Sequence, residues 1–405
     1  MDPSGIKIED YDYLLPDERI AKYPLPQRDR SKLLVLKNGK ISENVFSALP
    51  ELLPQNTLLL FNETRVIQAR LLFRKPTGAQ IEIFCLEPVE PVSDFQRAFQ
   101  QKPPVVWKCL VGNARRWKSG RLETQLTVGH RTIRLFAERR SALQDAFLIA
   151  FSWAPEDISF ADILEASGKT PLPPYLHREA EETDKTRYQT VYARLDGSVA
   201  APTAGLHFTD RVLQRLEERG IATEKLILHV GAGTFKPVSA ETIGAHQMHT
   251  EQIRVSLQTL QHLFEAADKQ IIPVGTTSMR SLESLFWMAL RLYHNLEAPF
   301  SVQQWDPYRL PLPGNFSAQY ALKLLITHLK KEHEPVLKGE TRLMIAPGYR
   351  FRFAKGLITN FHQPKSTLLL LVSALIGDQW REVYDYALQH GFRFLSYGDS
   401  CLFLP

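Results

Sequence analysis

Four loops rich in small residues, each beside a short apolar run, constrain the fold of this chain more than any other feature. They span residues 197–209, 229–235, 275–280 and 358–367. The apolar runs LILHV, IIPV and GLI precede the last three loops and are typical of buried strands. Candidate N-caps for the helices that follow are Thr209, Thr277 or Ser278, and Ser366 or Thr367. Repeated strand, small-residue loop and helix predict an α/β fold with a ligand site at the carboxyl ends of its strands.

The composition of these loops also indicates a binding site. Small residues let backbone N–H groups approach a ligand, and a helix N-terminus favours anionic groups. Taken singly, glycines such as Gly231 and Gly233 serve tight turns, and histidines such as His207 are packed imidazoles. Because four such loops occur together, we expect one shared ligand site.

The rest of the composition excludes several classes of protein. A chain of 405 residues with 44% hydrophobic residues is expected to hold about two or three domains. It contains no apolar run long enough to span a membrane, and its first ten residues are polar and acidic, so we expect a soluble cytoplasmic protein. Cys85, Cys109 and Cys401 are widely spaced, which predicts packing thiols. No zinc-binding or phosphate-cradle motif occurs, so no metal is expected.

The positive charge of the chain is concentrated in one segment. Residues 65–150 contain 15 Lys and Arg against 7 Asp and Glu, whereas the whole chain has a net charge of +5. Short strand-like runs separated by polar breaks predict that 66–151 forms a smaller antiparallel β-barrel domain. This domain would interrupt a larger α/β catalytic domain formed by 1–65 and 152–405.

A basic cluster within this segment is a candidate RNA-binding surface. Arg115, Arg116 and Lys118 flank Trp117, a mixture that RNA-binding surfaces use. A solvated hairpin face would have the same composition. Both interpretations remain open from the residues alone.

A series of long motifs runs along most of the chain. The motifs are IAKYPLPQRDRSKLLVL (20–36), LLLFNETRVIQARL (58–71), YQTVYA (188–193), GSVAAPTAGLHFT (197–209), LHVGAGTFKPV (228–238), MHTE (248–251), VGTTSMRSLES (274–284), APGYRF (346–351), LITNFHQPKSTLLLLVSALIG (357–377) and FRFLSYGD (392–399). In order and spacing, this series resembles one known family, the S-adenosylmethionine:tRNA ribosyltransferase-isomerases of queuosine biosynthesis.

The resemblance implies a reaction with two substrates. The family transfers the ribosyl part of S-adenosylmethionine to 7-aminomethyl-7-deazaguanine at the tRNA wobble position, forms epoxyqueuosine, and releases adenine and methionine. S-adenosylmethionine is then a co-substrate rather than a cofactor. The resemblance also implies a larger α/β domain interrupted by a smaller β-barrel, in agreement with the break in charge at residue 65.

The implied chemistry requires a base that works near neutral pH, because a proton at C5′ must be removed and the aminomethyl nitrogen must attack as a neutral amine. Histidine meets this requirement. If the residues after Thr250 form a strand, Glu251 shares a face with His249 and would orient its imidazole. Asp399 is a further candidate carboxylate or a turn cap. The catalytic candidates are therefore His207, His229, His249, Glu251, His362 and Asp399.

Other polar residues of the same motifs are substrate-binding candidates by residue type. Arg280, just inside a predicted helix, could pair with the methionine carboxylate. The complete set is Asn62, Thr64, Arg65, Thr203, Gly231, Gly233, Thr234, Thr276, Thr277, Arg280, Asn360 and Tyr397.

Departures from the family pattern leave alternatives open. The segment 285–339 is longer than the family usually has and is a candidate lid, and Gln363 stands where leucine is more usual. The alternatives are a diverged S-adenosylmethionine-dependent transferase with another acceptor and a non-catalytic tRNA- or RNA-binding protein that uses the barrel. Scaffold loops of a binding protein, however, would not need histidine, threonine and asparagine at several strand ends.

Overall fold

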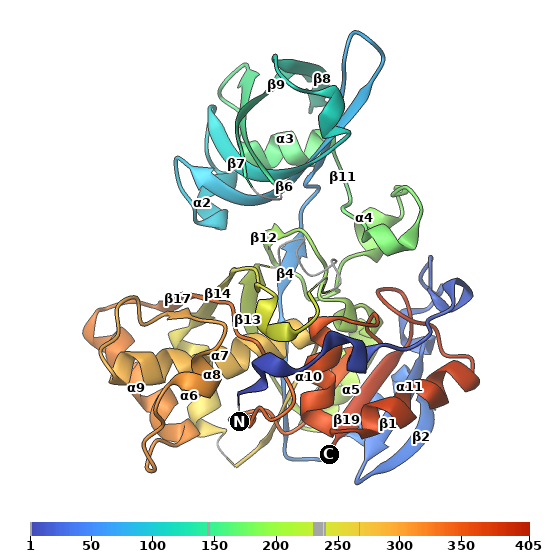
Figure 1. The fold of residues 1–405 in the computed structure, drawn as a ribbon, viewed down its shortest axis with the longest axis vertical. Coiled ribbons are helices and arrows are strands. Elements are labelled where there is room, and N and C mark those ends of the chain that lie inside the picture. Colours follow the sequence, from blue (N-terminus) through green and yellow to red (C-terminus); the bar gives the residue numbers. More distant parts are fainter. Residues whose placement is uncertain (1, 144–145, 230–237, 239, 267) are drawn as a thin grey trace.

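The chain folds into two bodies, one above the other in Figure 1. The computed structural model describes residues 2–143, 146–229, 238, 240–266 and 268–405. The upper body is a curved antiparallel sheet, and the lower body combines mixed sheets with helices. The predicted fold class, an α/β domain interrupted by a smaller β-barrel, is confirmed.

The lower body is built on a six-stranded sheet whose first three strands are parallel. Because these strands run the same way, the residues that follow them emerge at one edge of the sheet. In spatial order the strands are β15 (Gln270–Pro273), β3 (Thr57–Asn62), β13 (Ala222–His229), β14 (Glu251–Ser256), β17 (Val336–Thr341) and β16 (Ser301–Val302).

A four-stranded sheet continues this layer. Its order is β18 (Leu357–Asn360), β19 (Ser400–Leu404), β1 (Lys32–Lys37) and β2 (Lys40–Val45). A parallel bridge between Val274 and Ile358 joins the two sheets, so the loops after β15 and β18 are neighbours. Residues about 85 positions apart in the sequence are thereby placed at one site.

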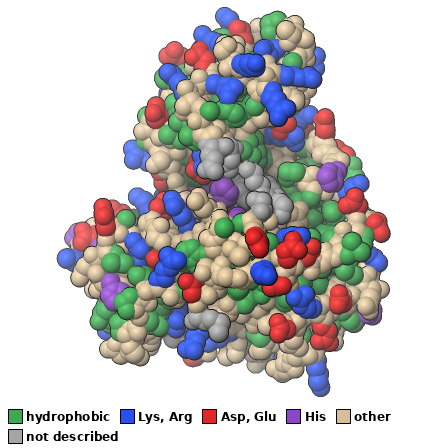
Figure 2. Space-filling model, in the orientation of Figure 1, with side chains coloured by type: hydrophobic (Ala, Val, Ile, Leu, Met, Phe, Trp, Pro, Cys, Tyr) green, Lys and Arg blue, Asp and Glu red, His purple; other side chains and the backbone are tan. Residues whose placement is uncertain are grey.

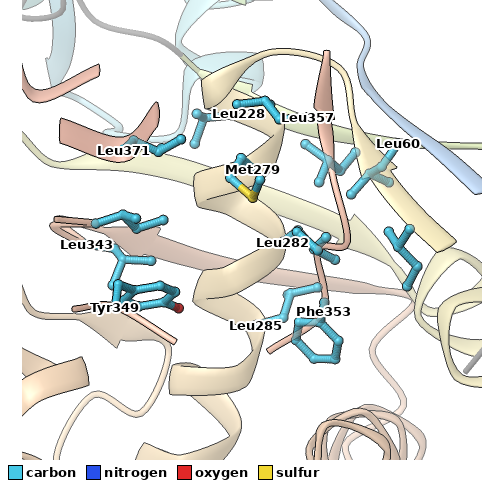
Figure 3. Packing of buried hydrophobic residues seen from close by; sticks show 14 of the residues in the cluster. Leu60, Leu228, Met279, Leu282, Leu285, Leu343, Tyr349, Phe353, Leu357 and Leu371 are labelled. Carbon is cyan, nitrogen blue, oxygen red and sulfur yellow. The ribbon is translucent and has the colours of Figure 1, made fainter. Parts of the chain in front are cut away.

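The core of the lower body is packed around the long helix α7 (Thr276–Tyr293). Figure 3 shows Met279, Leu282 and Leu285 of this helix among apolar side chains from the surrounding strands and loops. Nearly every residue of this helix is buried, its polar residues included, so those polar groups need partners inside the protein. Its buried Glu283 accepts hydrogen bonds from Tyr349 Oη at 2.8 Å and from three backbone N–H groups of residues 352–354.

The start of α7 differs from the prediction. Thr277 or Ser278 was expected to cap it, but Gly275 is the N-cap and has φ +90°. This left-handed backbone conformation favours glycine, and it lets the helix begin directly after β15. The predicted caps are therefore wrong by two or three residues, and Thr277 is free for other contacts.

The remaining helices of the lower body agree better with the sequence. Helix α5 (Asp210–Glu218) is capped by Thr209, as predicted. Helix α10 (Thr367–Ile376) is capped by Ser366, one of the two residues predicted for this position. The others are α1 (Leu49–Leu52), α4 (Asp184–Arg187), α6 (Leu257–Glu265), α8 (Asp306–Arg309), α9 (Ala318–Lys331) and α11 (Gln379–Gln389).

The segment 285–339 supports the sheet. Strand β16 pairs with β17, and α9 packs against α6 and α7, at the left of the lower body in Figure 1. Gln304, just before α8, donates to the carbonyl of His246 at 2.7 Å and accepts the N–H of Met248 at 2.9 Å. The segment therefore holds the 246–248 loop in place and is part of the body of the domain.

The upper body is a seven-stranded sheet in which every pairing is antiparallel. Its first and last long strands, β5 and β8, lie against each other, so the sheet closes into a barrel. The short helices α2 (Phe95–Phe99) and α3 (Phe160–Ser167) accompany it. The strands in spatial order are β11 (Gly168–Lys169), β5 (Arg70–Arg74), β6 (Gln80–Glu90), β7 (Val105–Gly112), β10 (Phe147–Ala154), β9 (Arg131–Ala142) and β8 (Leu122–Val128).

The chain passes between the two bodies beside a two-stranded parallel pair. Strand β4 (Thr64–Val66) leads into the barrel, and β12 (Leu195–Ser198) follows the return. Cys85 and Cys109 lie buried in the barrel and Cys401 in the lower body, all as free thiols, which confirms the predicted packing role. None of the described helices is both long and apolar enough to cross a membrane.

Candidate active site

Three of the four predicted loops meet around one cavity of the lower body. Loop residues 200–204, 275–277 and 359–363 line it, together with the start of α10. Predicted site residues in its wall are Thr203, Thr276, Thr277, Arg280, Asn360 and His362. The enclosed space is about 90 Å³, below the roughly 300–1,000 Å³ of small-molecule sites. A nucleoside-sized ligand therefore requires the surrounding side chains to move.

The N-terminus of α7 faces this cavity. Gly275, Thr276 and Thr277 bring the first backbone N–H groups of the helix to the wall. The buried Thr277 Oγ1 has no hydrogen-bond partner within the described part of the chain. A helix N-terminus with a spare hydroxyl is suited to a polar, electron-rich group of a ligand.

Arg280, one turn further along α7, adds a positive charge to the cavity wall. Its guanidinium and the Glu251 carboxylate form a buried ion pair. Burial lowers the pKa of Arg280 to about 10, so the side chain is still charged at neutral pH. The buried Nε of Arg280 makes no hydrogen bond to any described residue, which leaves it available to an anionic ligand.

Asn360 connects the cavity to His207. Its side-chain amide nitrogen donates to the carbonyls of Leu395 at 2.9 Å and Ser396 at 3.3 Å, so its oxygen must face the imidazole. The distance from His207 Nε2 to this oxygen is 2.9 Å, and Ser31 Oγ lies 2.8 Å from Nδ1. His207 therefore carries its proton on Nε2, and both ring nitrogens are engaged.

His362 lies in the wall of the same cavity. Its Nε2 is 2.9 Å from Thr359 Oγ1. Burial lowers the pKa of His362 to about 3 and that of His207 to about 4. Both imidazoles are consequently neutral at pH 7 and can accept or donate hydrogen bonds without carrying charge.

His229, at the end of β13, lies where the lower body meets the barrel. Its Nδ1 donates to the carbonyl of Gly197 at 2.8 Å, and the ring of Phe95 in α2 stacks on it at 4.9 Å. Burial lowers the pKa of His229 to about 4. The neutral ring therefore has its proton on Nδ1.

The sequence matches one family over nearly its whole length. The model of the queuosine biosynthesis proteins matches residues 8–403. The chain belongs to this family.

Two curated relatives are both called S-adenosylmethionine:tRNA ribosyltransferase-isomerase. The protein of Halothermothrix orenii is 38% identical and aligns over 98% of this chain and 100% of its own length. The protein of Pelobacter propionicus is 37% identical and aligns over 97% of this chain and 98% of its own length. A crystal structure of S-adenosylmethionine tRNA ribosyltransferase from Thermotoga maritima is 27% identical over 98% of this chain and 100% of that one, with a TM-score of 0.47.

Several residues expected at the substrate of a queuosine biosynthesis protein have structural partners instead. Asn62 and Thr64 are fully buried, and both bind the backbone of Leu228 at 2.8–3.1 Å. They join the end of β3 to the end of β13. Arg65 is exposed, with its Nε 3.8 Å from Asp196. None of these three side chains lines the cavity described above.

Two further candidates are held at the carboxyl-terminal side of the domain. The Asp399 carboxylate accepts the N–H groups of Lys32 at 3.0 Å and Arg393 at 2.8 Å, as a turn cap would. Tyr397 Oη donates to Asp184 at 2.8 Å. Both side chains hold neighbouring segments in place near the end of the chain, and neither lines the cavity.

The histidine before β14 is placed differently from the expectation. His249 is exposed, while Glu251 opens β14 with its carboxylate bound by Arg280. The Arg280 guanidinium is thus an established partner of the Glu251 carboxylate, and the orienting role of Glu251 toward His249 stays a prediction. Gly231, Gly233 and Thr234, three further candidates, lie outside the described residues.

The basic residues of the predicted barrel cluster are exposed, but Trp117 between them is fully buried, so the predicted aromatic part of this surface is wrong. Arg115, Arg116 and Lys118 are exposed, and no ion pair between described residues includes them. By contrast, Arg131 and Arg134 are paired with Asp157 and Glu123 at 2.7 and 2.8 Å. Figure 2 shows several basic side chains, with some acidic ones among them, on the visible face of the upper body.

Sequence reasoning missed some of the cavity wall of this queuosine biosynthesis protein. Tyr175, Met248 and Ser396 line the cavity, and Tyr175 Oη is 2.6 Å from Ser396 Oγ. Tyr175 ends the proline-rich run PLPPY (171–175), and an aromatic residue at the end of such a run is a usable signal. Within the described residues, no group of three His, Cys, Asp or Glu side chains is arranged to hold a metal ion.

Proposed function

We propose that the protein transfers and isomerises the ribosyl moiety of S-adenosylmethionine onto 7-aminomethyl-7-deazaguanine at the tRNA wobble position. The products are epoxyqueuosine-tRNA, adenine and methionine. The observation that carries the proposal is the match to the queuosine biosynthesis family over residues 8–403, with relatives of that activity aligned from end to end. The partners in this scheme are S-adenosylmethionine, as co-substrate, and tRNA, and no metal is invoked.

The cavity offers suitable groups for S-adenosylmethionine. Arg280 and the N-terminus of α7 would bind the carboxylate of the methionine part. Asn360 and the loop hydroxyls would hydrogen-bond the ribose or the base. His362 is neutral and buried in the same wall, so it would accept or donate a hydrogen bond without placing a second positive charge beside the sulfonium.

The reaction is tested by following both products. Incubation with S-adenosylmethionine and tRNA carrying the modified base is expected to release adenine and to raise the mass of the tRNA by the transferred group. The matched control is the same tRNA with unmodified guanine, which should give neither product. A protein that binds tRNA but releases no adenine would support the non-catalytic alternative. Adenine release without a change in the tRNA would indicate another acceptor.

A cytoplasmic location belongs to the same proposal, since the described cysteines are free thiols and tRNA is the acceptor.

The barrel is the proposed contact for tRNA. Replacing Arg115, Arg116 and Lys118 by glutamine is expected to weaken tRNA binding and to leave S-adenosylmethionine affinity unchanged. Each lost phosphate contact should flatten the log–log dependence of affinity on salt by roughly 0.7 to 0.9. Filter binding at several salt concentrations measures both effects. The control is Arg131→Gln, at an arginine already paired with Asp157. An unchanged salt slope in the triple variant would remove this cluster from the tRNA site.

A further inference from the structure

One short segment of the inserted barrel, residues 93–96, contacts the lower body. Phe95 of α2 stacks on His229 with an angle of 19° between the ring planes, and Trp107 of the barrel core meets the same phenyl ring at 5.8 Å. Phe95 is buried, so its ring cannot turn away without opening this packing. The imidazole is thus held by a side chain that belongs to the other body.

Polar contacts on both sides of Phe95 fix the docked position. The Asp94 carboxylate lies 3.3 Å from the Arg254 guanidinium. The side chain of Gln252 donates to the carbonyl of Ser93 at 3.0 Å, and that of Gln96 to the carbonyl of Asp196 at 3.2 Å. Asp94 and Arg254 are also the charged groups that act on the imidazole of His229. Three strands of the lower body, β12, β13 and β14, therefore take part in the contact.

The imidazole of His229 is fixed in one tautomer. Since the Gly197 carbonyl can only accept, Nδ1 carries the proton and Nε2 has a free lone pair. A side chain at Gly197 would place its Cβ 2.2 Å from Nδ1, so glycine is required for this close approach. His229 is only 2% exposed, and among the described residues no donor reaches its Nε2. A buried acceptor without a donor is unfavourable and calls for an explanation.

We propose that Nε2 of His229 accepts a hydrogen bond from a primary amine of the bound substrate, and that Phe95 of the barrel is the positioning residue for this imidazole. The inference rests on the proposed function, in which both substrates carry such an amine: the amino group of S-adenosylmethionine and the aminomethyl group of the tRNA base. The barrel then completes the active site in addition to binding tRNA. A rigid stacked ring fits this role because small misplacements of a reacting group are costly.

Four variants test the inference. His229→Asn keeps a donor close to the Nδ1 position and removes the Nε2 acceptor, and should lower kcat by roughly 100-fold. Phe95→Leu removes the stacked ring and should lower kcat by roughly 10-fold or more. Phe95→Tyr keeps the ring and should therefore keep kcat near the wild-type value. Phe99→Leu is the matched control, since Phe99 is equally buried in α2 and stacks on Trp107. It should lower thermal stability as Phe95→Leu does and leave kcat near the wild-type value.

The two sources of the amine are separated by binding measurements. If the donor is S-adenosylmethionine, His229→Asn weakens its binding in calorimetric titration without tRNA. If the donor is the tRNA base, that affinity is unchanged and the loss appears only in turnover and in the KM for modified tRNA. Either pattern supports the acceptor role of Nε2.

The tautomer of His229 is measured without any substrate. Nitrogen-15 NMR of labelled protein, assigned by comparison with His229→Asn, should show Nδ1–H in the wild type and a mixture of tautomers in Phe95→Leu. An Nε2–H tautomer in the wild type, or equal kcat for Phe95→Leu and Phe99→Leu, would overturn the inference. Failure of the wild type to release adenine would instead contradict the proposed function, while the NMR result stands by itself.

Discussion

Replacing Arg280 by methionine is expected to destabilise the protein by roughly 3–5 kcal/mol and to abolish measurable turnover. The guanidinium is the partner of the buried Glu251, and removing one member of a buried pair leaves the other charge uncompensated. The same change removes the positive charge from the cavity wall. Urea unfolding measures the first effect, and adenine release measures the second.

A double variant separates these two effects. Arg280→Met with Glu251→Leu replaces both charges by apolar groups, and should recover most of the lost free energy of unfolding. Its turnover should remain lost, because the cavity still lacks the group proposed to bind the carboxylate. Recovery of turnover together with stability would show that Arg280 only holds the fold. Arg280→Lys, which keeps the charge without the planar fork, is expected to lie between the wild type and Arg280→Met.

The free energy of unfolding should fall by about 6 kcal/mol between pH 7 and pH 5. Burial lowers the pKa of His207 and His229 to about 4 and that of His362 to about 3, from an ordinary value of 6.5. Between pH 6.5 and pH 4 the unfolded chain therefore binds protons that the folded chain excludes. The free energy of unfolding therefore rises with pH across this window and stops rising above it. Each histidine contributes roughly 2 kcal/mol to the loss at pH 5.

Urea unfolding at the two pH values measures this loss directly. His362→Gln should reduce the difference between the two pH values by about one third, although it also lowers stability at pH 7. His130→Gln is the control, since His130 is exposed and should leave the difference unchanged. Equal free energies of unfolding at pH 5 and pH 7 would contradict the lowered pKa values. They would mean that the three imidazoles are solvated or paired with carboxylates in the folded protein.

Much of the architecture could be predicted because it depends on local patterns. The period of apolar residues and the capping residues predict where α5 and α10 begin to within one residue. The change from helical to strand-like runs near residue 65 predicts the barrel. The loops that meet at the cavity were also predictable, since residues after parallel strands emerge at one edge of a sheet.

Partner choice could not be predicted in the same way. Asn62, Thr64 and Asp399 have the residue types of a substrate site, yet each is satisfied by backbone groups that lie far away in the sequence. The pairing of Arg280 with Glu251 depends on the distance between α7 and β14, which no spacing along the chain reveals. The contribution of Phe95 requires the docked position of an entire second body.

The parallel pair of β4 and β12 has a consequence for the length of the insertion. The chain leaves the lower body beside the point where it returns, and Thr64 and Leu195 are paired neighbours. An insertion with adjacent ends can change in length without shifting the register of the sheets that it leaves. The sheets of the lower body therefore constrain the crossing at β4 and β12 and leave the length of the barrel loops unconstrained.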